Sequence, residues 1–252
     1  EEARYGDFDA FKCSNCGAEI ITDDNTTATS CSYCGSPAII KGRLTGQLMP
    51  STVIPFRLDR EAAKAKYRDW AKSGVLTPGA FKKEATINEI KGIYVPFWLY
   101  DYNCHVNMAA NADKVRRERR GDMEYTHTSH FYVTRDMEDK YEKIPADASK
   151  KMPDDIMDRL EPFDYNELIK FEMPYLSGYS SEKFNYTKEE MNNRAERRAR
   201  TYAFQECRDS ISGYSSVRVV GSNIRLQRTR ADYALLPVWM LNYTYKGKNY
   251  FF

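Results

Sequence analysis

Four cysteines near the N-terminus have the spacing of metal ligands. Cys13 and Cys16 form one Cys-x-x-Cys pair and Cys31 and Cys34 form a second, with fourteen residues between the two pairs. Two residues between thiolates let the backbone curl so that both sulfurs face one point, and this separation of the pairs is typical of a structural zinc site. Because four thiolates fill a tetrahedral Zn²⁺, no position stays open for water or substrate. We therefore predict one structural zinc ion.

The residues around the cysteines are those of a zinc ribbon. Gly17 and Gly35 each follow a pair and tolerate the positive φ that completes such a turn. Residues 18–21 and 26–30 suit two short strands joined at residues 23–25. The alternatives are two disulfides or a redox dithiol. Disulfides need an oxidising compartment and a redox pair is expected in a βαβ context, whereas the sequence contains neither a secretory signal nor that context.

The composition excludes several classes of protein. The chain has 252 residues, of which 42% are hydrophobic and 29% charged, so it is long enough to bury a core and is not a disordered chain. A net charge of +2 does not by itself indicate a nucleic-acid partner. No apolar stretch approaches the roughly 18–20 residues of a membrane-spanning helix. We expect a cytosolic chain that continues beyond Phe252.

We expect a domain boundary near residue 46. Gly42, Gly46 and Pro50 form a linker-like stretch. We therefore expect residues 1–46 to form the zinc ribbon and residues 47–252 to form an α+β body.

Two main helices are expected in this body. The first covers Arg60–Ser73, with Asp59 as its N-cap, and its predicted buried stripe is Ala63, Tyr67, Trp70 and Ala71. The second covers residues 187–211 and begins with a Thr-x-x-Glu capping box. Expected strands cover residues 52–58, 83–90, 93–103, 106–113, 125–135, 168–173 and 217–220, with a hairpin at residues 243–252.

Two aromatic segments indicate an internal duplication. Residues 93–102 and 235–243 align Pro96 with Pro237 and Trp98 with Trp239, and a charged, strand-like segment precedes each of them. The alternative is a chance match over nine residues. If the duplication is real, residues 47–150 and 151–252 are pseudo-repeat halves. The expected fold is then α+β: a zinc ribbon followed by a two-lobed, duplicated, mostly antiparallel sheet body.

The remaining nucleophiles and bases do not form a catalytic pattern. Cys104 and His105 are adjacent, but neighbouring residues of a strand point to opposite faces, so they cannot form a dyad. The same argument separates His127 from His130. Cys207 fits a packing position beside its helix. Because no phosphate-binding loop, His-Glu-x-x-His motif or nucleophile elbow is present, we predict no enzymatic activity and no small-molecule substrate.

Basic residues gather at two places. Arg116, Arg117, Arg119 and Arg120 precede Gly121 and fit a solvated hairpin end. On the second helix, one reading is an ordinary surface face balanced by glutamates, and the other is a contact face for phosphate, as nucleic acid or as lipid headgroups. The candidate contact residues on this helix are Arg194, Arg197, Arg198, Arg200 and Arg208.

The chain resembles the bacterial TFIIB-type zinc-ribbon-containing proteins. The resemblance rests on CSNCG and CSYCG, on VIPFRLDREAAKAKYRDWAKSG with GAFKKEATINEIKGIYVPFWLYDY, and on YALLPVWMLNYTY. Such proteins are often labelled replication-restart helicases or phage replisome organisers, although this chain has no Walker A motif. The resemblance implies C-terminal membrane anchoring on the cytoplasmic side, and a role beside SPFH-type and phage-shock membrane-stress proteins.

These observations lead to one main expectation and one rival. We expect a non-enzymatic, zinc-binding interaction or scaffold module that holds partner proteins at the membrane, in a bacterial envelope-stress response. The rival is a replication-related nucleic-acid-binding protein that uses the zinc ribbon and the arginine-rich helix face. Its binding would fall steeply with salt.

Overall fold

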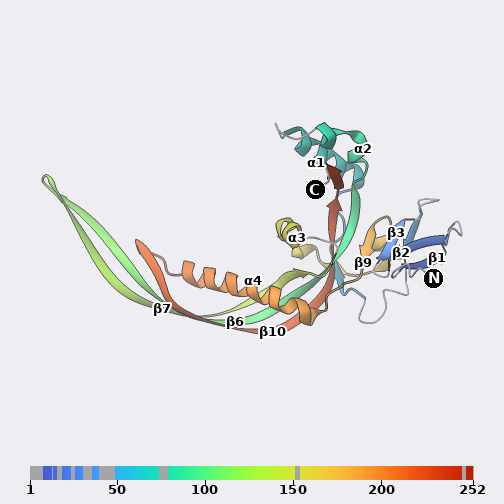
Figure 1. Ribbon diagram of the computed structural model, residues 1–252. Helices are drawn as coiled ribbons and strands as arrows, with labels where there is room; N and C mark the ends of the chain where they lie inside the picture. The colour runs from blue at the N-terminus through green and yellow to red at the C-terminus, as the bar shows by residue number, and fades with distance from the viewer. Residues whose placement is uncertain are drawn as a thin grey trace, which may run out of the picture. The chain divides into compact units, whose positions relative to one another are not determined.

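The structure, a computed structural model, forms two compact units (Figure 1). Unit 1 comprises Glu1–Trp98, Asp147–Thr187 and Asp232–Phe252, and unit 2 comprises Leu99–Ala146 and Lys188–Ala231. Each unit therefore combines residues from both halves of the chain. The residues that the structure describes are 8–12, 14–15, 19–23, 26–30, 36–39, 49–73, 79–150, 154–245 and 248–251.

Strands dominate the secondary structure of the described residues. The helices are α1 (Arg60–Ser73), α2 (Glu84–Ile87), α3 (Asp154–Leu160) and α4 (Lys188–Asp209). The strands are β1 (Phe8–Lys12), β2 (Glu19–Asp23), β3 (Thr26–Ser30), β4 (Pro37–Ile39), β5 (Thr52–Val53), β6 (Lys91–Arg120), β7 (Met123–Asp147), β8 (Ile169–Lys170), β9 (Ser180–Glu182), β10 (Ser216–Met240), β11 (Asn242–Tyr245) and β12 (Lys248–Phe251).

The main sheet is mixed, and this corrects the expected fold class. Its order is β4-β3-β9-β6-β10-β5-β8, with β7 pairing with β6. Strands β6 and β9 are parallel, as are β10 and β5, whereas β3 is antiparallel to both β4 and β9. The prediction of an α+β fold with a separate zinc ribbon and a mostly antiparallel body is wrong, because β3 of the N-terminal segment joins the main sheet through β9. The expected boundary near residue 46 lies outside the described residues.

In unit 1 the aromatic segments of β6 and β10 form a buried core. Tyr94, Phe97, Leu235 and Leu236 are each at most 1% exposed. Their strands are neighbours in the sheet, so apolar side chains on both contribute to the same core. Gly92 is needed for close packing here, because a Cβ at this position would lie 2.6 Å from the ring of Tyr179.

Helix α1 has the bounds predicted from its sequence. The Asp59 side chain accepts a hydrogen bond from the backbone N–H of Ala62 at 2.7 Å, which confirms the N-cap. Ala63, Tyr67 and Ala71 are buried, as expected for positions four residues apart. Trp70 was expected in the same stripe, but it is 48% exposed.

The predicted internal duplication is wrong. Residues 85–91, expected to be a strand before the first aromatic segment, include most of α2, whereas residues 224–229 before the second segment belong to β10. Ile87 and Ile90, three residues apart, turn to one side and pack with α1 residues and Leu241. The two aromatic segments thus share one core and follow different local structures.

Unit 2 is a three-stranded sheet with one helix on one face (Figure 1). Strands β6 and β7 are joined by a turn in which Gly121 has a φ of +64°. Strand β10 runs opposite to β6, since Ser215 bonds to Asp113 at one end and Thr229 to Asp101 at the other. Small residues let α4 lie close to the sheet: Ala195, Ala199, Ala203 and Cys207, at every fourth position, are each 0% exposed.

Candidate functional site

The four predicted zinc ligands, Cys13, Cys16, Cys31 and Cys34, lie outside the described residues, but the strands that flank them are described. Lys12 of β1 pairs with Glu19 of β2, and Ser30 of β3 pairs with Pro37 of β4. Each pairing leaves six residues between the strands. In both segments the first and fourth of these are cysteines and the fifth is glycine. In the sequence, the two Cys-x-x-Cys pairs therefore occupy equivalent positions between two pairs of antiparallel strands.

Cys104 and His105 belong to opposite faces of β6, as expected from strand alternation. Cys104 is 4% exposed and packs in the core under α4, together with Cys207. Burial is the main cause that raises the pKa of each of these thiols. Because the thiolate is the reactive form of cysteine, both side chains are suited to packing rather than to nucleophilic attack.

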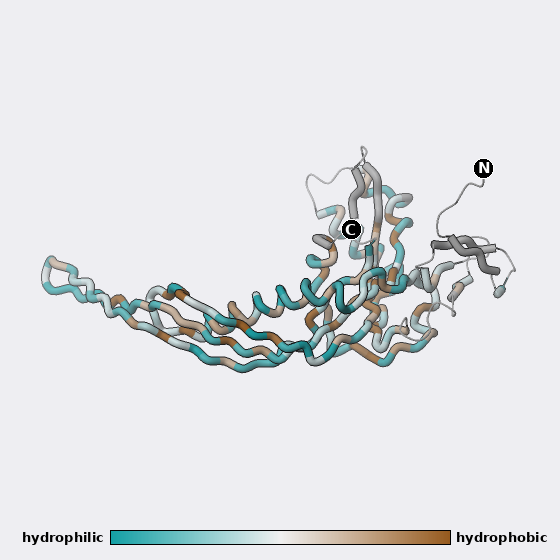
Figure 2. Tube along the Cα trace, turned by 60° about the horizontal axis from the view of Figure 1, so that its bottom comes forward, coloured by the Kyte–Doolittle hydropathy of each residue, from teal (hydrophilic) through white to brown (hydrophobic). Residues whose placement is uncertain are grey.

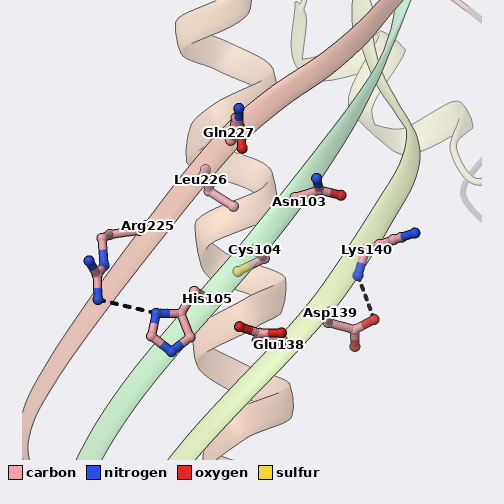
Figure 3. Close-up of a pocket in the computed structure, with 9 residues that line it drawn as sticks. All are labelled: Asn103, Cys104, His105, Glu138, Asp139, Lys140, Arg225, Leu226 and Gln227. Carbon is pink, nitrogen blue, oxygen red and sulfur yellow. Dashed lines mark hydrogen bonds between the residues drawn. The ribbon is translucent and has the colours of Figure 1, made fainter.

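His105 lies on the open face of the unit 2 sheet, between side chains from both neighbouring strands (Figure 3). Its Nε2 is 2.6 Å from Oδ1 of Asp136 on β7, and its Nδ1 is 3.2 Å from Nη2 of Arg225 on β10. Arginine can only donate, so Nδ1 accepts and Nε2 carries the proton that is donated to Asp136. These contacts fit the tautomer that carries its proton on Nε2.

His105 and Arg225 line an open hollow of about 770 Å³, whose wall also includes Cys104 and Leu226. Asn103, Glu138, Lys140 and Gln227 also line it, so it offers hydrogen-bond donors and acceptors of both charge signs. Asp136 and Arg225 are 31 and 120 residues from His105, and sequence reasoning missed both of them. Strand alternation could identify His105 as outward-facing, but no local signal identifies its two partners.

His127 and His130 also lie on opposite faces, as predicted for a strand. Nδ1 of His130 is 2.7 Å from Asp113, and the hydroxyl of Ser216 donates to the same carboxylate at 2.8 Å. The hydrogen bond from His130, followed by that from Ser216, lowers the pKa of Asp113. His127 instead lines a different hollow. This hollow is on the same face of the sheet as α4, beyond the end of the helix.

The arginines of α4 are divided between packing and solvent. Arg198 donates to the carbonyl oxygen of Pro145 at 3.0 Å, and Arg200 donates to that of Ile224 and pairs with Glu196 at 2.6 Å. These contacts brace the helix against β7 and β10. Of the five candidate contact residues, Arg197 and Arg208 are exposed, whereas Arg194, Arg198 and Arg200 are partly buried.

Residues 114–132 of β6 and β7, which we call the arm, extend beyond the end of α4 (Figure 1). The hairpin end predicted at the arginines before Gly121 is confirmed, and Figure 2 shows its tip mostly in the hydrophilic colour. Five large apolar residues of the arm are nevertheless 40–68% exposed: Val115, Met123, Tyr125, Phe131 and Tyr132.

Comparison with known proteins places this chain in a family. It is 44% identical over 292 aligned residues to the uncharacterized protein YdjG of Bacillus subtilis (strain 168), with 96% of this chain and 86% of that protein covered. The chain belongs to the same family as YdjG. No family model and no solved structure matches it.

Two further findings concern only the described part of the chain. No helix there is long and apolar enough to cross a membrane. No group of three or more His, Cys, Asp or Glu side chains is placed there to hold a metal ion, and the four cysteines are not among these residues.

Proposed function

We propose that the protein is a non-enzymatic interaction module whose N-terminal segment is stabilised by one structural Zn²⁺ and which holds partner proteins at the cytoplasmic side of a membrane. The observation that carries the proposal is the arm, a two-stranded ribbon with five large apolar side chains exposed. Isolated two-stranded ribbons are only marginally stable in water, and exposed apolar groups gathered on one element are typical of binding surfaces.

The equivalent sequence positions of the two cysteine pairs support the proposal of a structural zinc site. In each hairpin an antiparallel pair holds the two ends of a six-residue Cys-x-x-Cys-Gly-x segment. Such a segment can direct both thiolates to one point, and two of them complete a tetrahedral set. When bound, Zn²⁺ would cross-link the β1–β2 hairpin to the β3–β4 hairpin, which is part of the main sheet.

The state of the remaining cysteines supports a non-enzymatic role. The raised pKa values of Cys104 and Cys207 favour the unreactive thiol form, and His105 faces away from Cys104. The membrane location and the stress-response setting rest on the resemblance to TFIIB-type zinc-ribbon-containing proteins alone.

The interaction role can be tested with the full-length protein isolated from membranes. Wild type and Tyr202→Ser, which changes an exposed tyrosine on α4, should both retain a stoichiometric partner protein. Tyr132→Ser on the arm should lose it, because it removes the most exposed apolar side chain of the arm. Retention of the partner by Tyr132→Ser, or isolation of the wild type without any partner, would contradict the proposal.

The zinc ion is tested separately by native mass spectrometry and elemental analysis. One zinc per chain is expected, and Cys13→Ser/Cys16→Ser should lose it, whereas Cys104→Ser should retain it. A chain without metal, with Cys13–Cys16 and Cys31–Cys34 oxidised, would overturn the zinc site.

A further inference from the structure

The face of β6 that α4 covers changes its chemistry where the helix ends. Met108, Ala110 and Ala112 are buried on this face, and the next two residues on it are Lys114 and Arg116. Figure 1 shows β6 and β7 continuing beyond α4. The strand alternation therefore continues, with cations in place of core residues.

These cations line an open hollow of about 810 Å³ within unit 2. Strand β6 contributes Lys114 and Arg116, and β7 contributes His127 and Ser129. The segment that follows α4 closes one side with Tyr214, which comes directly after Gly213 with its φ of +82°. Such a turn suits glycine because it has no Cβ.

The hollow has more positive than negative charge available to a ligand. Its carboxylate, Glu118, is already 3.0 Å from Arg120. Lys114 and Arg116 take part in none of the ion pairs found among the described residues. Nζ of Lys114 instead lies 5.4 Å from the ring centroid of Tyr214 and 5.8 Å from that of Phe131, at cation–π distances.

We propose that this hollow is a binding site for a phosphate group, carried by a soluble phosphate compound or by a phospholipid headgroup. A guanidinium can donate two parallel hydrogen bonds to phosphate oxygens, and an ammonium group adds a compact charge. His127 and Ser129 supply further donors on the same face. A bound phosphate would also relieve the repulsion between Lys114 and Arg116, which are two residues apart on the same face of β6.

The opposite face of the arm provides a matched control. Arg117 and Arg119 alternate with Arg116 along β6, so they point away from the hollow. Two double variants each remove two positive charges from exposed positions: Lys114→Gln/Arg116→Gln and Arg117→Gln/Arg119→Gln. Circular dichroism should show that both variants keep the fold of the wild type.

Binding is measured with pyrophosphate by calorimetry, and with vesicles of phosphatidylglycerol and phosphatidylcholine by co-sedimentation. Lys114→Gln/Arg116→Gln should weaken binding about tenfold or more, since two charge-assisted contacts are lost. Arg117→Gln/Arg119→Gln should change it by less than about twofold, as expected for charges that make no direct contact. Binding of pyrophosphate would identify a soluble ligand, and binding of phosphatidylglycerol vesicles alone would identify a headgroup.

Two results would overturn this site. One is that neither pyrophosphate nor phosphatidylglycerol vesicles bind to the wild type. The other is that both double variants weaken binding equally, because attraction to the general charge of the arm does not distinguish its faces. Neither result depends on zinc or on a partner protein, so the outcome is independent of the proposed function.

Discussion

Strand β6 passes through two environments that differ in how many of its faces are covered. Residues 92–100 are buried at every position, whereas from Tyr102 to Ala112 every second residue is buried. The first stretch reads GIYVPFWLY and is apolar throughout, and the second reads YNCHVNMAANA and alternates. A strand covered on both faces needs a continuous apolar run, and a strand covered on one face needs an apolar residue only at alternate positions.

One continuous strand therefore belongs to a core in one stretch and exposes side chains in the next. In the alternating stretch α4 covers the side of Cys104, and the other side presents His105 in the hollow that it lines with Arg225. Further on, in the arm, most side chains on both faces of β6 are exposed. From the first stretch to the arm, fewer side chains of β6 pack against other parts of the chain and more of them are exposed to solvent.

Two phenylalanines, one in the core and one on the arm, should differ most in their contribution to stability. Phe97 is 0% exposed and makes an edge contact with Phe163 at 5.8 Å, so Phe97→Ala should lower the free energy of unfolding by about 3–5 kcal/mol. Phe131 on the arm is 40% exposed, and Phe131→Ala should cost less than about 1 kcal/mol. Urea denaturation measures both changes. Equal losses would show that the arm is as well packed as the core.

A smaller effect is expected where α4 meets the sheet. Ala199 is 0% exposed, so Ala199→Leu should overpack the contact and cost about 1–3 kcal/mol. Gln205→Leu changes an exposed position on the same helix and should stay within about 0.5 kcal/mol. The two variants are compared by thermal and urea unfolding. If Ala199→Leu is tolerated as well as its control, the helix does not lie close to the sheet.

Alkaline pH should lower the free energy of unfolding, because each of the two units contains a buried tyrosine. Burial is the main cause that raises the pKa of Tyr94 in unit 1 and of Tyr102 in unit 2 to about 12. The unfolded value is near 10, so the folded state favours the neutral phenol, and this stabilisation is lost as pH rises from about 10 towards 12. Between about pH 9 and pH 11, wild type should lose about 1 kcal/mol more than Tyr94→Phe. Parallel pH curves for the two proteins would exclude this role of Tyr94.

The smallest effect is expected at the tip of the arm. Met123 is 61% exposed, so Met123→Ser should change the free energy of unfolding by no more than about 0.5 kcal/mol. The midpoint of urea unfolding provides the measurement. A larger loss would mean that Met123 is buried in solution, for example against a second copy of the chain.

Much of the local structure could be predicted from the sequence because its signals are local. Helical spacing and an N-cap define α1, and the capping box places the start of α4 within one residue. The opposite orientations of Cys104 and His105 follow from strand alternation alone. The hairpin of β11 and β12 was likewise predicted and is confirmed.

The tertiary structure alone decided which distant elements pair. Parallel pairing of β6 with β9 joins segments nearly ninety residues apart, and nothing in either segment specifies the partner. Repeated aromatic segments suggest two lobes, but residues 93–98 and 235–243 belong to the same unit, and β6 and β10 are neighbouring strands. Asp136 and Arg225 meet His105 only because β7 and β10 lie on either side of β6. Periodicity determines which face of an element is apolar, whereas the choice of neighbour depends on the packing of the whole chain.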